Sequence, residues 1–488
     1  MIAANRARLA AWSERRKLAI AEIIDAARGY LAGYGIAVPK RSGEGLVIAG
    51  HQPELFHPGV WIKNFALEKL AVPHGLLGLS LIVDNDVAKS ASIRVPVGLP
   101  DGSARRQAVP FDRWTGPVPY EEWNVRDEKA FTDFPAAVEE AMGAIQWRPM
   151  LPAFWREAQA LAARTSRVGE RLAMARRLWE ARWDCRNLEL PLSRLAGTNA
   201  FRQFAAGLIH EAPRLLAVYN EALLAYRRRH GIVSRNHPVP ELIQHGDWHE
   251  VPLWVWRAGD TKRGRLYARL GGASIELGAG EIAIGRSPSS FDAVAAYLAD
   301  LDRQGWKIRP RALTNTLFAR LFLADLFIHG IGGALYDELT DDIIHRFYGL
   351  EPPGFMVLTG TLRLPQPSWE NGPNWKEAHW RLRHIWHHPE EHLRNGIAAN
   401  AEIQALCRQK KELIAEQPIA PAERRHRFRA ILAINERLRP LVQSEHDAMQ
   451  SMLAEAQNRE LAQKVWQDRE YAFCLYPEDE LRAWYKEL

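Results

Sequence analysis

Residues 46–50 form a short apolar run, Leu-Val-Ile-Ala-Gly, that is followed at once by His51 and Gln52. A buried parallel strand delivers polar side chains to the edge of a sheet in this way, and residues 61–70 are suited to the helix that would follow. Ligands of open α/β sheets bind outside the carboxyl ends of the strands, where helix N-termini attract anions. The alternative is an ordinary turn with His51 and Gln52 in solvent.

The pattern returns at residues 79–83, another short apolar run, which ends in three polar residues, 84–86. Parallel strands joined by a right-handed crossover bring their carboxyl ends to one edge of the sheet. We therefore predict an α/β fold with a crevice at this edge. The residues expected there are His51, Gln52, Lys63, Asp84, Asn85, Asp86 and Lys89. Asp-Asn-Asp is also favourable turn chemistry, so a plain turn is the alternative.

A third segment combines residues 308–317 with an apolar run over 321–328 and a glycine-rich stretch that begins at His329. Glycines placed directly after a strand let a ligand approach the backbone, and their N–H groups can form an anion-binding nest. The residues expected at the site are Arg311, Asn315, His329, Gly330, Gly332, Gly333 and Tyr336. The alternative is a tight turn in which His329 and Tyr336 are structural.

The glycine spacing fits neither the dinucleotide-binding motif nor the P-loop. A nucleotide cofactor such as ATP or ADP is therefore left open. The histidines at 379, 384, 387 and 388 do not predict a metal site, because no carboxylate or cysteine completes a recognisable ligand pattern.

Composition predicts a globular chain of two or three domains, with 488 residues of which 47% are hydrophobic and 25% charged. No run is apolar enough for a signal peptide or a membrane span, so we expect a cytoplasmic protein. The three cysteines, Cys185, Cys407 and Cys474, are too far apart for a disulfide framework or a cysteine zinc site, and we expect them to be reduced.

The net charge of +6 is spread along the chain, with 64 basic against 58 acidic residues. The densest basic clusters, 227–230 and 424–429, fall on expected helices, where a solvated helix face is the common interpretation. We do not expect nucleic-acid binding. The excess positive charge fits a small anionic metabolite as the partner.

The composition and residue spacing along the chain suggest four parts. Residues 1–130 and 236–370 are expected to form the core, and 131–235, rich in Ala, Leu, Arg and Trp at helical spacing, a helical insertion. Residues 94–120 are expected to extend the first sheet, and strands at 251–256 and 264–270 to rejoin it.

Residues 371–488 are expected to form a helical hairpin of coiled-coil type, interrupted at Pro418 and Pro421. The apolar segment 471–476 predicts a C-terminal tail that docks back onto the core. At the other end of the chain, residues 5–34 are expected to form one amphipathic helix against the sheet.

These blocks, in their order, resemble the BshC family, the cysteine-adding enzymes of bacillithiol biosynthesis. The likeness is carried by residues 47–52 with 55–59, the acidic strand end at Asp84, residues 309–317, and Gly332-Gly333 with Tyr336. The helical insertion and the late coiled coil also fall in the same order. The sequence differs from the family where His51 replaces a glutamine and where residues 84–86 form a shorter acidic motif without a histidine.

The resemblance implies a Rossmann-like core with helical insertions and a coiled coil that mediates homodimerisation. It also implies a ligase-like reaction that forms a C–N bond between cysteine and a small anionic amino-sugar conjugate. In such a reaction we expect His51, Asp84 and Asp86 to be catalytic. The other site residues would bind substrate, with Arg311 pairing with a carboxylate and the glycines cradling an anion.

Two alternatives stay open. The first block, up to about residue 110, also resembles the WbqC-like family, which is associated with polysaccharide gene clusters. The other alternative is a non-catalytic binding or scaffold protein that retains the fold and engages a partner through its coiled coil and basic helices.

Overall fold

The computed structural model describes residues 1–39, 43–280, 282–366, 374–393 and 400–488. A parallel sheet lies inside the body of the molecule, with the strand order β15-β14-β1-β2-β7. Every neighbouring pair in it is parallel, which confirms the predicted α/β class. Its strands are β1 (Leu46–His51), β2 (Leu77–Ile82), β7 (Leu188–Pro191), β14 (Ala324–His329) and β15 (Phe355–Val357).

The order of these strands reverses direction once. The chain runs outward from β1 through β2 to β7, and then returns to the other side of β1 with β14 and β15. Numbered along the chain, the strands therefore lie in the order 3-2-1-4-5. The reversal falls between β1 and β14, so the carboxyl ends of these two strands flank the topological switch point of the sheet.

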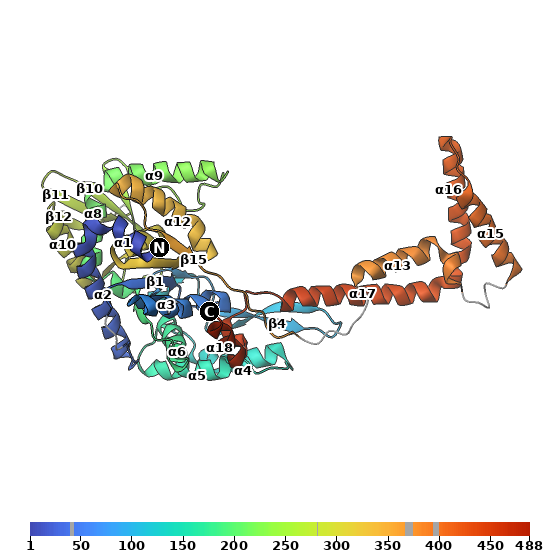
Figure 1. The fold of residues 1–488 in the computed structure, drawn as a ribbon, viewed down its shortest axis with the longest axis horizontal. Coiled ribbons are helices and arrows are strands. Elements are labelled where there is room, and N and C mark those ends of the chain that lie inside the picture. The colour runs from blue at the N-terminus through green and yellow to red at the C-terminus, as the bar shows by residue number, and fades with distance from the viewer. Residues whose placement is uncertain (40–42, 281, 367–373, 394–399) are drawn as a thin grey trace.

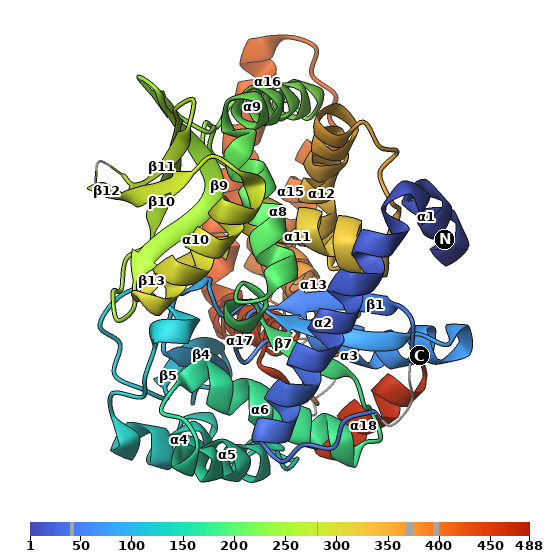
Figure 2. The same cartoon turned by 90° about the vertical axis from the view of Figure 1, so that its left-hand side faces the viewer.

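Alternate residues of β1 point to opposite faces of the sheet, and helices cover both faces. Val47 and Ala49 pack in one apolar cluster with Ala66 and Leu67 of α3 (Pro58–Ala71). Leu46 and Ile48 belong to the main core, together with residues of α2 (Ser13–Gly33), which also contacts β7. The helix expected over 5–34 is interrupted: α1 (Ile2–Arg8) and a 3₁₀ turn precede α2, which crosses the body in Figure 2.

Strands 251–256 and 264–270 do not rejoin the parallel sheet, so that prediction is wrong. They belong to a separate antiparallel sheet with the order β12-β11-β10-β9-β13, in which β8 also pairs with β9. From β8 to β12 each strand pairs with the next one along the chain, whereas β13 pairs with β9 (Figure 2). The strands are β8 (Gln244–His245), β9 (Trp248–Arg257), β10 (Gly264–Leu270), β11 (Ser274–Ala279), β12 (Ile282–Pro288) and β13 (Trp306–Pro310).

Residues 94–120 do not extend the first sheet either. β4 (Ser92–Gly98) and β5 (Ala104–Pro110) pair with each other in a hairpin, and β3 (Val87–Ala88) pairs with β6 (Val118–Pro119). The hairpin turn between β4 and β5 satisfies both strands locally, so they form a two-stranded sheet of their own.

The segment 131–235 is mostly helical but also supplies β7, an edge strand of the parallel sheet that ends at Pro191. Proline is tolerated there because an edge strand has one unpaired side. The helices around it are α4 (Glu128–Met142), α5 (Leu151–Ala160), α6 (Val168–Arg182), α7 (Leu192–Leu195), α8 (Asn199–His210) and α9 (Ala212–Arg229). Later in the chain, α10 (Phe291–Arg303) packs against α8 and β13.

In the described part of the chain, the helices α13 (Trp375–His387), α15 (Ala401–Ala415), α16 (Pro421–Leu438) and α17 (Gln443–Trp466) form an arm that projects from the body (Figure 1). α13 lies along α17, and α15 pairs with α16 at the far end. The predicted hairpin is therefore present, with Pro418 between α15 and α16 and Pro421 at the first position of α16. The part boundary expected near residue 370 lies outside the described residues.

The C-terminal tail returns to the body after α17, as predicted. Every residue of 471–476 is buried, and the Phe473 ring lies 4.4 Å from that of Trp61, centroid to centroid. α18 (Glu478–Lys486) then packs against α3. In the described part of the chain, no helix has both the length and the apolar character needed to cross a membrane.

Candidate functional site

A cavity of about 440 Å³ opens at the carboxyl ends of β1 and β14, the switch point of the parallel sheet. We call it the sheet-edge cavity. The predicted site residues that line it are His51, Gln52, Lys63, Asn315, His329, Gly330, Gly332, Gly333 and Tyr336. The first and third of the predicted segments therefore meet at this edge, through β1, β14 and α11 (Ala312–Phe318), whereas residues 84–86 of the second do not line this cavity.

A smaller cavity of about 220 Å³ adjoins it, and we call it the side cavity. The two share five lining residues, Gln52, Val83, Ala312, Leu313 and Asn315. Three further predicted residues, Asn85, Asp86 and Arg311, line the side cavity together with Trp254 and Arg263. A larger, open hollow of about 1230 Å³ lies along α2 and contains none of the predicted site residues.

His51 stands at the end of β1 with its side chain 27% exposed. Its Nδ1 lies 3.2 Å from the Gln52 carbonyl oxygen, which can only accept, so Nδ1 carries the proton and Nε2 keeps its lone pair. Burial, reinforced by the charge of Lys63, lowers the pKa of His51 to about 3. His51 is therefore a neutral hydrogen-bond acceptor at pH 7, and not the general acid expected from its ordinary pKa.

Lys63 is a buried cation of the sheet-edge cavity. It lies on α3 at 5% exposure, and its Nζ donates to the Gly50 carbonyl oxygen at 3.0 Å. Burial alone lowers its pKa to about 8, and no carboxylate among the described residues offsets it. A mostly protonated, unpaired ammonium at pH 7 favours an anion in the adjoining space.

The start of α12 (Ile331–Ile343) adds a second source of positive potential. Gly330 is the N-cap residue, and no side chain caps the first turn. The first N–H groups of a helix have no intrahelical acceptor and attract anions. A Cβ at Gly333 would lie 2.8 Å from His329 Nδ1, whereas the same atom at Gly332 would meet open space. Glycine at 333 is thus required by the approach of His329.

His329 is held by a buried ion pair. Its Nε2 lies 2.7 Å from Asp337 Oδ2, which Arg320 also contacts at 2.7 Å. Burial would raise the pKa of Asp337, but the hydrogen bond from His329 and the charge of Arg320 hold it below its ordinary value. Asp337 therefore remains ionised, and His329 both lines the cavity and fixes the start of α12.

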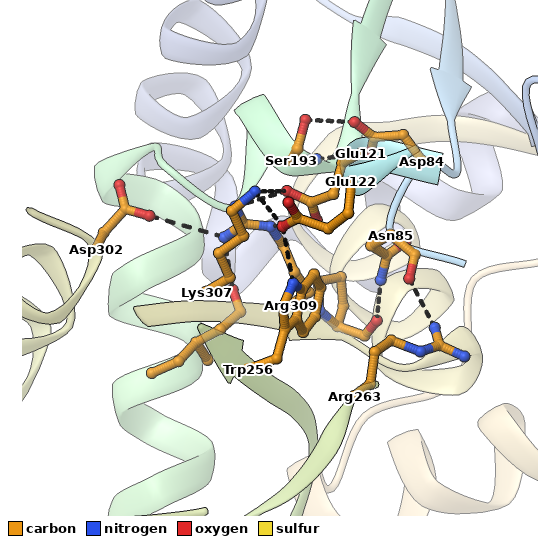
Figure 3. A network of polar contacts seen from close by, with 12 residues as sticks. Asp84, Asn85, Glu121, Glu122, Ser193, Trp256, Arg263, Asp302, Lys307 and Arg309 are labelled. Atoms are coloured by element: carbon orange, nitrogen blue, oxygen red, sulfur yellow. Dashed lines mark hydrogen bonds and ion pairs between the residues drawn. The ribbon is translucent and has the colours of Figure 1, made fainter. Parts of the chain in front are cut away.

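Asp84 does not line either cavity. It is buried, and its carboxylate accepts hydrogen bonds from the Ser193 N–H, at 2.9 Å, and from the Ser193 hydroxyl (Figure 3). Burial, together with the nearby charge of Glu121, raises its pKa to about 7. The geometry thus gives Asp84 a contact with the start of α7, away from the space where a substrate would lie.

Asp86 and Asn85 face the side cavity. Asp86 Oδ2 accepts from Gln52 Nε2 at 2.9 Å, and Arg263 donates to Asp86 Oδ1 at 3.3 Å. Arg263 also donates to the Asn85 carbonyl oxygen at 2.7 Å (Figure 3). Asn85 donates to the Pro310 carbonyl oxygen, while its Oδ1 is buried without a partner. Arg263 was not predicted, because its isolated position in a turn carries no sequence signal.

Arg311 already has a carboxylate partner. Its Nη2 lies 2.7 Å from Glu250 Oε1, and its guanidinium stacks over Trp254. A bidentate pair with a substrate carboxylate would have to displace Glu250. Asn315 is different, because its buried Oδ1 has no partner and the residue lines both cavities. Lys89 is exposed and lines neither.

His57 and Arg469 are among the lining residues of the sheet-edge cavity that were not predicted. His57 caps α3 by accepting from the Gly59 N–H at 3.1 Å, and burial lowers its pKa. The His-Pro pair at the start of a helix was a readable signal for this cap. Arg469 reaches the cavity from the C-terminal tail, more than 400 positions along the chain from His57. The docking of the tail was predictable, but not its contribution to the site.

The polar network of Figure 3 fixes the antiparallel sheet against this site. Arg309 of β13 binds both carboxylate oxygens of Glu121: its Nε donates to Oε1 at 3.0 Å and its Nη2 donates to Oε2 at 3.1 Å. Lys307 contacts Glu121 at 3.1 Å. The Glu121 N–H donates to the Asp84 carbonyl oxygen at 2.8 Å, so the network reaches the end of β2 directly.

A scan against protein-family models finds no match for the chain, and a search of curated proteins finds no similar sequence.

Proposed function

We propose that this chain is an enzyme that binds a small anionic substrate in the sheet-edge cavity. The observation that carries the proposal is Lys63, a buried ammonium with no carboxylate partner among the described residues, on the wall of that cavity. The uncapped start of α12 lines the same cavity and favours the same sign of ligand charge. An anion between them would satisfy both.

We further propose a ligase-like reaction that joins two molecules through a C–N bond. The resemblance to the BshC family supplies the reaction class, with cysteine and an anionic amino-sugar conjugate as substrates. Two adjoining cavities that share Gln52 and Asn315 suit such a reaction, because each can hold one reactant next to the other. The unpartnered Oδ1 of Asn315 would accept from an amine or hydroxyl at the junction.

In the C–N bond-forming step, the amine would attack the carboxyl carbon of cysteine. The bond from that carbon to its leaving oxygen would break and release water, or phosphate where ATP activates the carboxyl group, and His51 would accept the amine proton at Nε2. A pKa of about 3 makes the free imidazole a weak base, but a bound anion would raise it by favouring the charged form. The substrate itself would thus bring His51 toward the range in which a histidine works as a base. Asp84, which contacts Ser193, has no part in this scheme.

A Rossmann-like core is part of the same proposal. The strand order 3-2-1-4-5 and the cavity at the reversal point support a Rossmann-like core. A nucleotide such as ATP or ADP is kept among the candidate ligands. The cytoplasmic setting and a homodimer formed through the arm complete the proposal as the resemblance implies it.

The test is turnover of cysteine with glucosaminyl-malate, followed by mass spectrometry of the joined product. His51→Ala and Lys63→Met should each lower kcat/KM by at least about 100-fold, as expected for removal of a proton acceptor or a buried counter-charge. Lys89→Ala, an exposed lysine outside both cavities, is the control. Undiminished turnover in both cavity variants would overturn the assignment.

A scaffold role is the second candidate, favoured by the apolar surface of the arm. Trp380, Phe428 and Ile419 are 62%, 61% and 86% exposed. A protein partner whose binding depends on Phe428 and ignores His51 and Lys63 would favour this role over the enzyme. A WbqC-like activity would instead be indicated by binding of a sugar nucleotide in the sheet-edge cavity.

A further inference from the structure

The end of α13 carries a group of histidines and carboxylates far from the sheet edge. His384 and His388 are one helical turn apart, and the turn over Pro389–His392 brings Glu390 and Glu391 back toward them. We call these four residues the arm cluster. The sequence argument against a metal was the lack of a carboxylate, and this turn supplies two.

The ligand atoms of the arm cluster converge without bonding to one another. His384 Nε2 lies 3.7 Å from Glu391 Oε2. His388 Nδ1 lies 3.7 Å from Glu390 Oε1 and 3.9 Å from Glu391 Oε1. These distances exceed a hydrogen bond. His388, Glu390 and Glu391 each offer a ligand atom within 4.8 Å of the other two, and His384 adjoins this group through Glu391. Four ligands at zinc bond lengths of roughly 2.0–2.1 Å lie about 3.3 Å apart in a tetrahedron, so the three would move closer together and the His384 ring, which stacks on that of His388, would turn to complete the set.

A chain of hydrogen bonds determines which nitrogen of His384 faces the carboxylates without a proton. Glu445 of α17 accepts from His392 Nδ1 at 3.2 Å, which leaves the lone pair of His392 on Nε2. That nitrogen lies 3.0 Å from His384 Nδ1, which must therefore donate. In the neutral imidazole, Nε2 of His384 then carries a lone pair toward the Glu391 carboxylate.

A lone pair and a carboxylate facing each other at 3.7 Å call for a cation between them. A carboxylate behind a histidine is also the usual outer arrangement of a metal site, since it fixes the tautomer and raises the basicity of the ligand. Lys410 contacts Glu390 Oε2 at 2.5 Å, so Glu390 offers only Oε1. The group that would bind is thus two nitrogens and up to two carboxylates.

We propose that the arm cluster binds Zn²⁺ through His384, His388, Glu391 and Glu390. His384 lies in the last turn of α13 and His388 is the residue that ends this helix, and a mixed nitrogen and oxygen set suits this ion. The metal would fasten the turn over Pro389–His392 to α13. Through His392 and Glu445 it would also stabilise the contact of α13 with α17.

The test is a calorimetric titration of the full-length, chelator-treated protein with ZnCl₂ at pH 7.5. The wild type should bind one Zn²⁺ that is weakened more than about 100-fold by His388→Ala and by Glu391→Gln. His379→Ala, an exposed histidine on the same helix, should leave the affinity unchanged. His51→Ala should also leave it unchanged, which separates this site from the sheet-edge cavity.

Glu445→Gln tests the hydrogen bonds that run from Glu445 through His392 to His384. It removes no ligand, and the affinity should fall by roughly 10–100-fold, the usual cost of losing such a partner. Equal zinc affinity in the wild type, His388→Ala and Glu391→Gln would overturn the proposal. Absence of any binding event in the wild type would do the same, and would leave His384 and Glu391 as a pH-dependent ion pair. All of these exposed or half-exposed side chains can be changed without opening the core.

Discussion

Lys63 is held in a state that is unfavourable without a ligand. Its pKa is lowered from 10.5 to about 8 by burial, and one hydrogen bond to Gly50 is its compensation. A buried lysine whose pKa is lowered in this way destabilises the fold, so we expect it to have a function in ligand binding. The effect of Lys63 on the free energy of unfolding can therefore be measured without knowing the substrate.

Lys63→Met should raise the free energy of unfolding of the ligand-free protein by about 1–3 kcal/mol at pH 7, as the size of the pKa shift implies. The lowered pKa costs stability wherever the unfolded chain is protonated. The gain should therefore be full below pH 8, shrink as the pH rises and vanish above pH 10.5, where Lys63 becomes neutral in both states. Urea unfolding at several pH values measures it. Lys69→Met, an exposed lysine on the same helix, should show no such gain; a destabilised Lys63→Met would contradict the account.

Asp84 leads to a prediction of the opposite slope. Its pKa is raised from 3.8 to about 7, so the folded state holds a proton that the unfolded chain has lost. Its contribution is full below pH 3.8 and is lost as the pH rises through 7. Asp84→Asn should therefore be more stable than the wild type above pH 7, by about 1–3 kcal/mol, with the difference shrinking toward pH 4. Thermal melts from pH 4 to 8.5 measure this, and a constant difference across the range would refute it.

The residues of the site were partly predictable. His51, Gln52 and Lys63 follow from one strand end and the helix after it, and both features are local in the sequence. Asp84 and Arg311 are different, because their partners Ser193 and Glu250 are distant in the chain or lie on another strand. A sequence identifies an acidic strand end, but the partner that turns a side chain away from the cavity is set by tertiary packing.

At the scale of elements, the site depends on how the antiparallel sheet is held against the parallel one. Arg309 and Glu121 form a buried pair at 6% and 2% side-chain exposure, with Lys307 on the same carboxylate. Removal of one partner from a buried pair leaves an uncompensated charge. The contact therefore determines whether the side cavity keeps its shape.

Glu121→Gln should lower the free energy of unfolding by roughly 3–5 kcal/mol, because Arg309 would remain buried without its counter-charge. Asp302→Asn is the matched control. Asp302 lies 3.9 Å from Arg309 at 45% exposure, and such a pair contributes at most about 1 kcal/mol. Urea unfolding of the three proteins distinguishes the cases. Similar losses of unfolding free energy in both variants would mean that the buried Arg309–Glu121 pair stabilises the fold no more than the exposed Arg309–Asp302 pair.

The elements of the parallel sheet were easier to predict than those of the second sheet. β1, β2 and β14 are mostly apolar, with Ser80 in β2 and Asp325 in β14 as interior exceptions, and mostly apolar strands are typical of a sheet covered on both faces. Strands 251–256 and 264–270 carry the same apolar signal, but nothing in that signal says which sheet they join. The short turn between β9 and β10 decides it, because strands joined so closely pair antiparallel.

At the scale of the whole molecule, the arm is the part with the least packing of its own. Phe428 of α16 is 61% exposed on a helix pair with a small core of Leu406, Ile434 and Leu438. Exposed aromatic side chains on a projecting helix favour burial against another chain. The resemblance implies that this other chain is a second copy.

Light scattering after size exclusion should give the mass of a dimer at micromolar concentration, twice 55.4 kDa. Phe428→Asp should shift it to the monomer, because a carboxylate would be buried without a partner in the interface. Val233→Asp, at an exposed position on the body, should leave the dimer intact. A wild type that elutes as a monomer would remove the homodimer from the account.

The measurement that tests the sheet-edge cavity most directly is a thermal-shift panel on the wild type, His51→Ala and Lys63→Met. The ligands are malate, citrate, glucosaminyl-malate, cysteine, ATP, ADP and common sugar nucleotides. A ligand at a hundred times its Kd stabilises the native state by about 2.7 kcal/mol, which such a scan detects. We expect an anionic ligand to raise the Tm of the wild type, with the shift lost in both variants although Lys63→Met melts higher without ligand. Equal shifts in all three proteins would place the ligand elsewhere, and no shift with any anion would contradict the proposed site.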